Sequence, residues 1–167
     1  MSLVPIWRSG LGMVEGSFLS SPTIFTLNLR SPDPVPPAIQ SILPRAVPVH
    51  HLGLYREPLT LEPVEYYNNL PDPASHPPSG LAIIVDPVIA TGGTCAAAIQ
   101  TLKDWGARRI VVVSILGAKD GVSRAAEEWG DGTEIWLAGV DGEISDGGML
   151  KPGLGDIGDR LFLTMGK

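Results

Sequence analysis

The sequence has 167 residues, of which 44% are hydrophobic and 18% charged, so it can bury the core of one globular domain but is short for two. A net charge of −6 without a basic stripe argues against a nucleic-acid or membrane-surface partner. We expect a cytoplasmic protein for three reasons. The sequence has one cysteine, its start does not resemble a secretory signal, and no apolar run approaches the roughly 18 residues of a membrane span.

In the first half, residues 3–7 predict a strand and residues 10–16 a turn that enters a helix. Seven prolines then fall within residues 18–48, which excludes a helix or a central strand there. We expect residues 18–46 to form a Pro-rich surface loop inserted into a single domain that spans the whole chain. Strand-like residues return at 51–56, HLGLYR.

The second half alternates strands with helices of about ten residues. Apolar or β-branched runs predict strands at 81–85, 110–116 and 134–140. Residues 95–105 place their apolar side chains on one helical face, and Gly106 stands where a helix commonly ends. A second helix is expected to be capped by Asp120 and closed by Gly130. This order predicts an α/β fold with a mainly parallel sheet covered by helices on both faces.

The segment DPVIATGGT, residues 86–94, lies where the first of these strands passes into a helix. A helix N-terminus offers free backbone N–H groups to an anion, and Gly92 and Gly93 carry no Cβ that would obstruct a phosphate. The hydroxyls of Thr91 and Thr94 add donors, and Asp86 can accept from sugar hydroxyls. The pair of glycines alone is equally typical of an ordinary tight turn. The full segment predicts a site for a phosphorylated sugar, although it matches neither the P-loop nor the dinucleotide pattern.

DPVIATGGT also resembles the 5-phosphoribosyl 1-diphosphate (PRPP) loop of type I phosphoribosyltransferases, and of uracil phosphoribosyltransferases in particular. Three further segments are similar to that family and occur in its order: LVPIWRSGLGMVEG (3–16), HLGLYREPLTLEPVEYYNNLP (51–71) and KPGLGDIGDRLF (151–162). The resemblance implies the type I phosphoribosyltransferase fold and the reaction of uracil with PRPP to give UMP and diphosphate. It further implies Mg²⁺ as cofactor and a homodimer, and leaves GTP binding open.

The resemblance also implies roles for individual residues. Arg8 and Arg56 would contact the diphosphate, and residues 56–70, with Tyr66 and Tyr67, would form a mobile loop over the site. Asp156 would touch PRPP through Mg²⁺ or water, and it joins Arg8, Arg56 and Asp86 as a candidate catalytic residue. The ribose and its 5-phosphate would be held by Asp86, Pro87, Val88, Ile89, Ala90, Thr91, Gly92, Gly93 and Thr94. Uracil would be held by Leu150, Gly155, Asp156 and Ile157.

The sequence departs from the family in two respects. Residues 18–46 have no counterpart in it, and family members carry a segment before the LVPI strand that this sequence lacks. We therefore expect ligand recognition to be kept while turnover by this chain is weak. A domain that binds PRPP or a nucleotide without turnover is the alternative hypothesis. An RNA-binding regulator on the same fold is a third, against which the net charge argues.

Other conspicuous residues have simpler interpretations. Cys95 is expected to be a small packed residue, and His50 and His51 to be strand residues that point to opposite faces and do not share a metal. Asp141 and Glu143 are expected to be solvated at a strand end. Three tryptophans are expected to fill the core: Trp105, Trp129 and Trp136.

Overall fold

The computed structural model describes residues 1–14, 39, 42–57, 59–60 and 62–164. These form one α/β domain around a seven-stranded sheet of order β3-β2-β1-β4-β6-β5, with β7 paired to β6. The strands are β1 (Ser2–Trp7), β2 (Leu52–Arg56), β3 (Pro63–Asn68), β4 (Ala82–Val85), β5 (Val88–Ile89), β6 (Ile110–Ala118) and β7 (Thr133–Asp141). The helices are α1 (Leu11–Val14), α4 (Gly93–Trp105), α5 (Lys119–Glu127) and α6 (Ile157–Phe162).

The centre of the sheet is parallel. β1 pairs with β4, β4 with β6, and β6 with both β5 and β7, all in the parallel sense. β2 adds to β1 in parallel, and β3 pairs antiparallel to β2 at the edge. The prediction of a mainly parallel α/β sheet is confirmed. Because parallel strands all end at the same edge, the residues that follow β1, β4 and β5 are brought to one side of the molecule.

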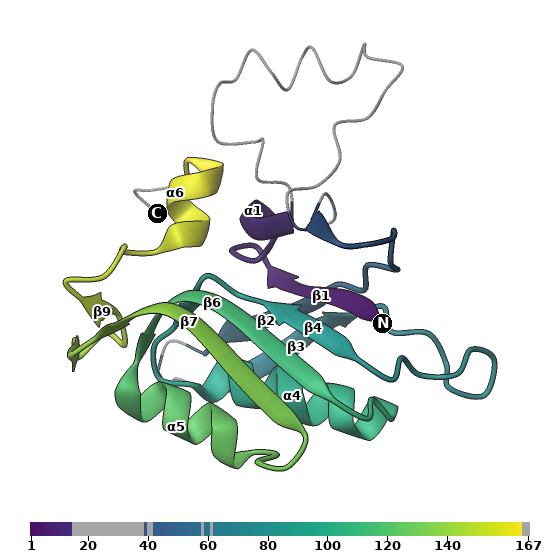
Figure 1. Cartoon of the computed structure of the whole chain (residues 1–167). Coiled ribbons are helices and arrows are strands. Elements are labelled where there is room, and N and C mark those ends of the chain that lie inside the picture. Colours follow the sequence, from purple (N-terminus) through teal and green to yellow (C-terminus); the bar gives the residue numbers. More distant parts are fainter. Residues whose placement is uncertain (15–38, 40–41, 58, 61, 165–167) are drawn as a thin grey trace, which may run out of the picture.

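Helices α4 and α5 pack on one face of the sheet (Figure 1). Their apolar side chains and those of the strands form the main core, in which Ile84, Ile99, Leu102 and Ile110 are fully buried. α4 ends as predicted at Gly106, which has a φ of 102°, a value that favours glycine. This ending fixes where the chain turns back into β6.

Two predictions about this layer are wrong. Asp120 does not cap α5: the N-cap is Ala118, without a side-chain bond, and the helix ends at Glu127 before Gly130 is reached. Trp136 does not fill the core, since it is 64% exposed, whereas Trp105 is 7% exposed. Trp136 alternates along β7 with Ile135 and Leu137, which point to the helix side. The other face of β7 is therefore not covered by the described residues.

The segment 56–70 is only in part a loop. Its second half forms the edge strand β3, because Val64, Tyr66 and Tyr67 favour extended structure. Tyr67 stacks on Trp7 with ring centroids 4.8 Å apart. Most of 18–46 lies outside the described residues, so its assignment as a surface loop stays a prediction.

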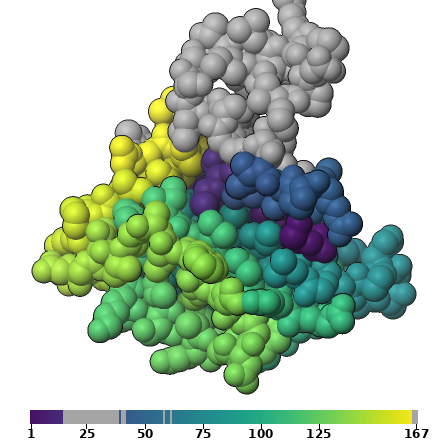
Figure 2. Space-filling model, viewed as in Figure 1, coloured from purple at the N-terminus to yellow at the C-terminus, as the bar shows by residue number. Residues whose placement is uncertain are grey.

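The C-terminal part forms a hairpin of β8 (Glu143–Ile144) and β9 (Leu150–Lys151), followed by α6. Neither the hairpin nor α6 was predicted. Within this segment, α6 lies beside the residues that follow β1; the two are close together in the space-filling view (Figure 2), and Arg8 binds Asp159. Among the described residues, none of the helices combines the length and apolar character needed to cross a membrane.

Candidate functional site

A cavity of about 730 Å³ opens at the carboxyl ends of the parallel strands. Its walls come from the ends of β1, β2 and β4, from the turn between β5 and α4, and from the C-terminal hairpin and α6. This is the position at which open α/β sheets bind ligands, because loops from several strand ends converge there. The cavity combines residues that are up to 152 positions apart in the sequence, from Ile6 to Gly158.

The proposed PRPP loop forms one wall of this cavity. Of its nine residues, Asp86, Val88, Ile89, Ala90, Thr91, Gly92 and Thr94 line the cavity, while Pro87 and Gly93 do not. Gly92 is the N-cap of α4, with a φ of 79° and no side-chain capping bond. The backbone N–H groups of the first turn of α4 therefore have no partner within the helix and can bind an anion.

Gly92 is required for a second reason. A Cβ at this position would collide with the backbone carbonyl oxygen of Gly121 in α5, and one on Gly121 would collide with the carbonyl oxygen of Ala90. The turn and α5 are thus in backbone contact. This contact holds the turn before α4 against a second helix.

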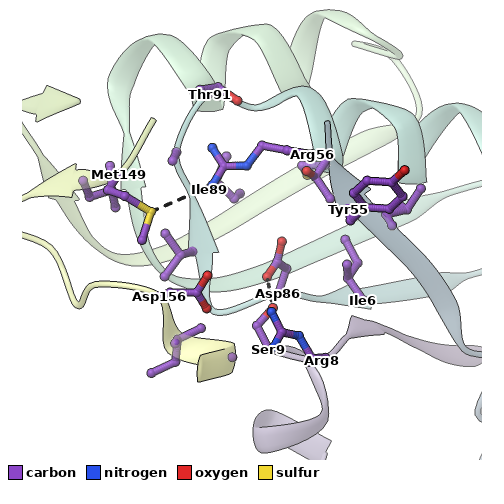
Figure 3. Close-up of a pocket in the computed structure, with 18 of the residues that line it drawn as sticks. Ile6, Arg8, Ser9, Tyr55, Arg56, Asp86, Ile89, Thr91, Met149 and Asp156 are labelled. Atoms are coloured by element: carbon purple, nitrogen blue, oxygen red, sulfur yellow. Dashed lines mark hydrogen bonds between the residues drawn. The ribbon is translucent and has the colours of Figure 1, made fainter. Parts of the chain in front are cut away.

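Asp86 is buried at the floor of the cavity, with 6% of its surface exposed. Ser9 Oγ donates a hydrogen bond to Asp86 Oδ1 over 3.0 Å (Figure 3). Burial raises the pKa of Asp86 to about 6, and the bonds from Ser9 and the Val88 backbone and the charge of Arg56 oppose this rise. A carboxyl group with this pKa ionises more readily when a ligand supplies further hydrogen-bond donors.

The two expected diphosphate residues lie on different sides of Asp86 (Figure 3). Arg8 follows β1 after a cis peptide bond and donates from Nη1 to Asp159 Oδ1 over 2.9 Å. Arg56 ends β2 and donates from Nη1 to the carbonyl oxygen of Gly148 over 2.9 Å. Both guanidinium groups therefore border the cavity and are bonded to the C-terminal segment.

The four expected uracil-side residues, Leu150, Gly155, Asp156 and Ile157, all line the cavity. Leu150 is buried, and Asp156 caps α6 by accepting from the N–H of Asp159 over 3.0 Å. Asp141 was expected to be solvated, but its Oδ2 accepts a hydrogen bond from the N–H of Gly153 over 3.0 Å. That bond helps to shape the turn between β9 and α6.

A model of the uracil phosphoribosyltransferase family matches residues 1–164. The chain belongs to this family. It is 43% identical over 164 residues to a uracil phosphoribosyltransferase of Finegoldia magna, covering 98% of this chain and 66% of that protein. A solved structure of an Aquifex aeolicus protein matches with a TM-score of 0.75 and 32% identity, over 96% of this chain and 64% of the other.

An adenine phosphoribosyltransferase (APRTase) of Giardia lamblia, solved in complex with 9-deazaadenine, matches with a TM-score of 0.50 and 15% identity, over 86% and 71% of the two chains. At that identity the likeness concerns the fold alone. The expected type I phosphoribosyltransferase fold is confirmed. The chain spans a little less than two thirds of the length of the Finegoldia magna and Aquifex aeolicus proteins. The activity of the longer relatives is therefore a proposal for this chain.

Some cavity residues were not singled out from the sequence, although they lie within or beside the segments that resemble the family. Ser9 could have been predicted from the sequence, because β1 and β4 are neighbouring parallel strands and the residues that follow them meet at one edge of the sheet. Met149, whose Sδ lies 4.0 Å from Arg56 Nη2, carried no signal, since its position depends on the hairpin. Tyr55 lines the cavity from β2 and was hidden among other strand-forming residues.

The simpler interpretation of Cys95 agrees with the structure, whereas His50 and His51 lie just before β2 and are not strand residues. Cys95 is 2% exposed, and burial raises the pKa of its thiol well above the usual range. His50 packs against Trp105, with ring centroids 5.7 Å apart, and burial lowers its pKa. In the described parts of the chain, there is no group of three or more His, Cys, Asp or Glu side chains that could hold a metal ion.

Proposed function

We propose that this chain carries the active site of a uracil phosphoribosyltransferase, which converts uracil and PRPP to UMP and diphosphate in pyrimidine salvage. One observation supports this most strongly: an anion-binding helix turn, a buried carboxyl group, two arginines and the uracil-side segment border the same cavity. The family membership is in agreement. We also propose, as expected from the sequence, that the protein is located in the cytoplasm and forms a homodimer. Sedimentation of the purified chain tests whether it is a dimer.

PRPP would bind with its 5-phosphate on the N–H groups at the start of α4 and with the hydroxyls of Thr91 and Thr94 beside it. The ribose hydroxyls would then face Asp86, whose carboxylate accepts their hydrogen bonds once it is ionised. Binding the sugar between two fixed points orients the anomeric carbon toward the base. These contacts are made alike by substrate and product, so they serve affinity and orientation.

The reaction breaks the bond between the anomeric carbon and the diphosphate oxygen and forms a bond from uracil N1 to that carbon. Negative charge gathers on the diphosphate, which also can accept the proton that N1 loses. Arg8 and Arg56 would stabilise this charge, because a guanidinium presents parallel N–H donors to phosphate oxygens. No side-chain nucleophile is needed, and Cys95 is buried with its pKa raised.

Uracil would lie against Leu150, with backbone N–H and C=O groups of Gly155–Ile157 at its polar edge. A site built to hydrogen-bond this edge leaves its own polar groups unpaired against cytosine. Discrimination by such a site reaches roughly 10⁴-fold. Equal turnover or equal binding of cytosine and uracil would refute this assignment.

The residues fit the way in which Mg²⁺ is usually held by phosphate-transfer sites. Asp86, Asp146 and Asp156 are the carboxylates that line the cavity, and Mg²⁺ commonly uses one or two carboxylates together with substrate phosphates and waters. Asp156 is the residue proposed to meet the ion, directly or through water. When bound, the ion would supply positive charge to the diphosphate.

The alternative is a domain that binds PRPP without turning it over. It is favoured by one observation: Arg56 already contacts the protein's own groups, with Nη1 donating to the Gly148 carbonyl oxygen and Nη2 lying 4.0 Å from Met149 Sδ. Release of UMP from uracil and PRPP, followed by chromatography, decides between the two. Formation of UMP that is lost in Arg56→Gln supports the enzyme; PRPP binding without any UMP supports the alternative.

A further inference from the structure

Arg8 and Asp159 join the N-terminal and C-terminal parts of the chain at the edge of the cavity. Arg8 Nη1 donates to Asp159 Oδ1 over 2.9 Å, and the same oxygen accepts from Thr164 Oγ1 over 2.7 Å. The Arg8 side chain also lies on α6, since a Cβ on Gly158 would stand 3.5 Å from Arg8 Nε. Arg8 is therefore held by the helix that directly follows the uracil-side residues.

These bonds leave part of the guanidinium available. Arg8 uses Nη1 for its bonds to both Asp159 and Thr164. Within the part of the chain that the structure describes, its Nε and Nη2 have no hydrogen-bond partner. A guanidinium has five N–H donors in one plane, so the remaining edge can still donate a parallel pair to a phosphate group.

Asp159 lies behind Arg8 as seen from the cavity. Arg8 and Asp156 line the cavity, whereas Asp159 does not. The Arg8 side chain is 52% exposed, and without a partner such a long side chain would sample many rotamers. Fixing it before the ligand arrives reduces the conformational entropy that binding costs.

We propose that Asp159 is a positioning residue, which holds Arg8 in place for the diphosphate of PRPP and so ties the diphosphate end of the cavity to the helix on the uracil side. This inference rests on the proposed function. The expected effect is selective: loss of the Asp159 charge should weaken the binding of ligands that carry a diphosphate. It should not weaken the binding of UMP, which fills the phosphate, ribose and uracil regions but carries no diphosphate.

The test is calorimetric titration of the full chain and of Asp159→Asn with PRPP and Mg²⁺, and separately with UMP. We expect the Kd for PRPP to rise about fivefold, the upper range for a partly exposed ion pair, and the Kd for UMP to stay within about twofold. Asp159→Glu, which keeps the charge, should restore part of the PRPP affinity. In the Arg8→Gln background, Asp159→Asn should have no further effect, because the partner is already absent.

One variant serves as a matched control. Glu127→Gln makes the same charge change at an exposed position of α5, away from Arg8. It should bind PRPP like the unmodified chain.

The outcomes separate the two proposals. Unchanged or tighter PRPP binding by Asp159→Asn, beside normal binding by the unmodified chain, overturns the positioning role alone. Equal weakening of PRPP and UMP, or additive effects in the double variant, also overturns it, because Asp159 would then only stabilise α6. Failure of the unmodified chain to bind PRPP overturns the positioning role and the proposed function together.

Discussion

The hydroxyl of Ser9 donates to the carboxylate of Asp86 over 3.0 Å, and this bond joins the ends of the neighbouring strands β1 and β4. It lies inside the cavity, where Asp86 is otherwise buried. A carboxylate in such a place is stabilised mainly by the donors it meets. Ligand binding, protonation and folding stability are therefore coupled at Asp86.

Binding of a ribose phosphate should release a proton at mildly acidic pH. The pKa of Asp86 is raised to about 6 in the free protein, and ribose hydroxyls that donate to the carboxylate would lower it. Affinity for ribose 5-phosphate should therefore fall as the pH falls through 6. Calorimetry at pH 6 in buffers of different ionisation enthalpy measures the released proton. Ser9→Ala should move the affinity midpoint to higher pH; an affinity that is flat from pH 5 to 8 would contradict the coupling.

Asp86→Asn should stabilise the free protein at neutral pH. The pKa of Asp86 is raised from 3.8 to about 6 on folding, so the folded state holds more protons between these values. The free energy of unfolding therefore falls as the pH rises through this window and stays lower above it, by about 3 kcal/mol at most. Asparagine does not ionise and lacks this loss. Urea unfolding at pH 4 and pH 8 checks it: the advantage of the variant should grow with pH, and a constant or shrinking difference would count against it.

The sequence predicts the parallel half of the fold well because its signals are local. The run 110–116 is rich in β-branched residues, which favour a strand. Gly106 ends α4 because its positive φ favours glycine. The hairpin β8–β9 is made of two-residue strands and α6 of six residues, too short for a periodic pattern. Their place beside Arg8 and Arg56 is set by contacts over more than 90 positions, which one sequence does not reveal.

The error at Trp136 has a different cause. The strand EIWLAGV was interpreted as buried on both faces, although Trp136 alternates with the residues that pack on the helices. The exposure of Trp136 could be predicted only with the knowledge that no described helix covers its side of β7. In the same way, the site segments were found through their resemblance to the family, whereas Ser9 and Met149 required the topology of the sheet and the hairpin.

Trp136 and Trp105 should respond very differently to substitution. Trp136 is 64% exposed on β7, so Trp136→Thr, which keeps a strand-forming residue, should change the free energy of unfolding by no more than about 0.5 kcal/mol. Trp105 is buried, and its Nε1 donates to the carbonyl oxygen of Pro71 over 2.8 Å. Trp105→Ala should cost about 3–5 kcal/mol. Urea unfolding followed by far-ultraviolet circular dichroism compares them, and similar losses would show that β7 is covered in solution.

Gly92→Ala should damage both the fold and the anion site. Gly92 has a φ of 79°, which costs an alanine about 1–2 kcal/mol, and its Cβ would collide with the rigid backbone carbonyl of Gly121. The turn can accept the methyl group only by moving away from α5. We expect a loss of about 2 kcal/mol or more in unfolding free energy and a loss of roughly 10²-fold in affinity for ribose 5-phosphate, because the N–H groups leave their positions.

The neighbouring glycine provides the control for this substitution. Gly93 is the first residue of α4 and does not line the cavity, and a Cβ there would meet only side-chain atoms, at 3.6 Å from Arg124 and 3.7 Å from Pro63. Alanine also favours a helix over glycine by up to about 1 kcal/mol. Gly93→Ala should therefore fold at least as stably as the unmodified chain. In contrast to the expectation from the sequence that a Cβ at Gly93 would obstruct a phosphate, the variant should bind ribose 5-phosphate with similar affinity, because its methyl group would point away from the cavity. If both variants lost binding to the same degree, the contact between Gly92 and Gly121 would not be what shapes the site; if neither did, the 5-phosphate would not bind at the start of α4.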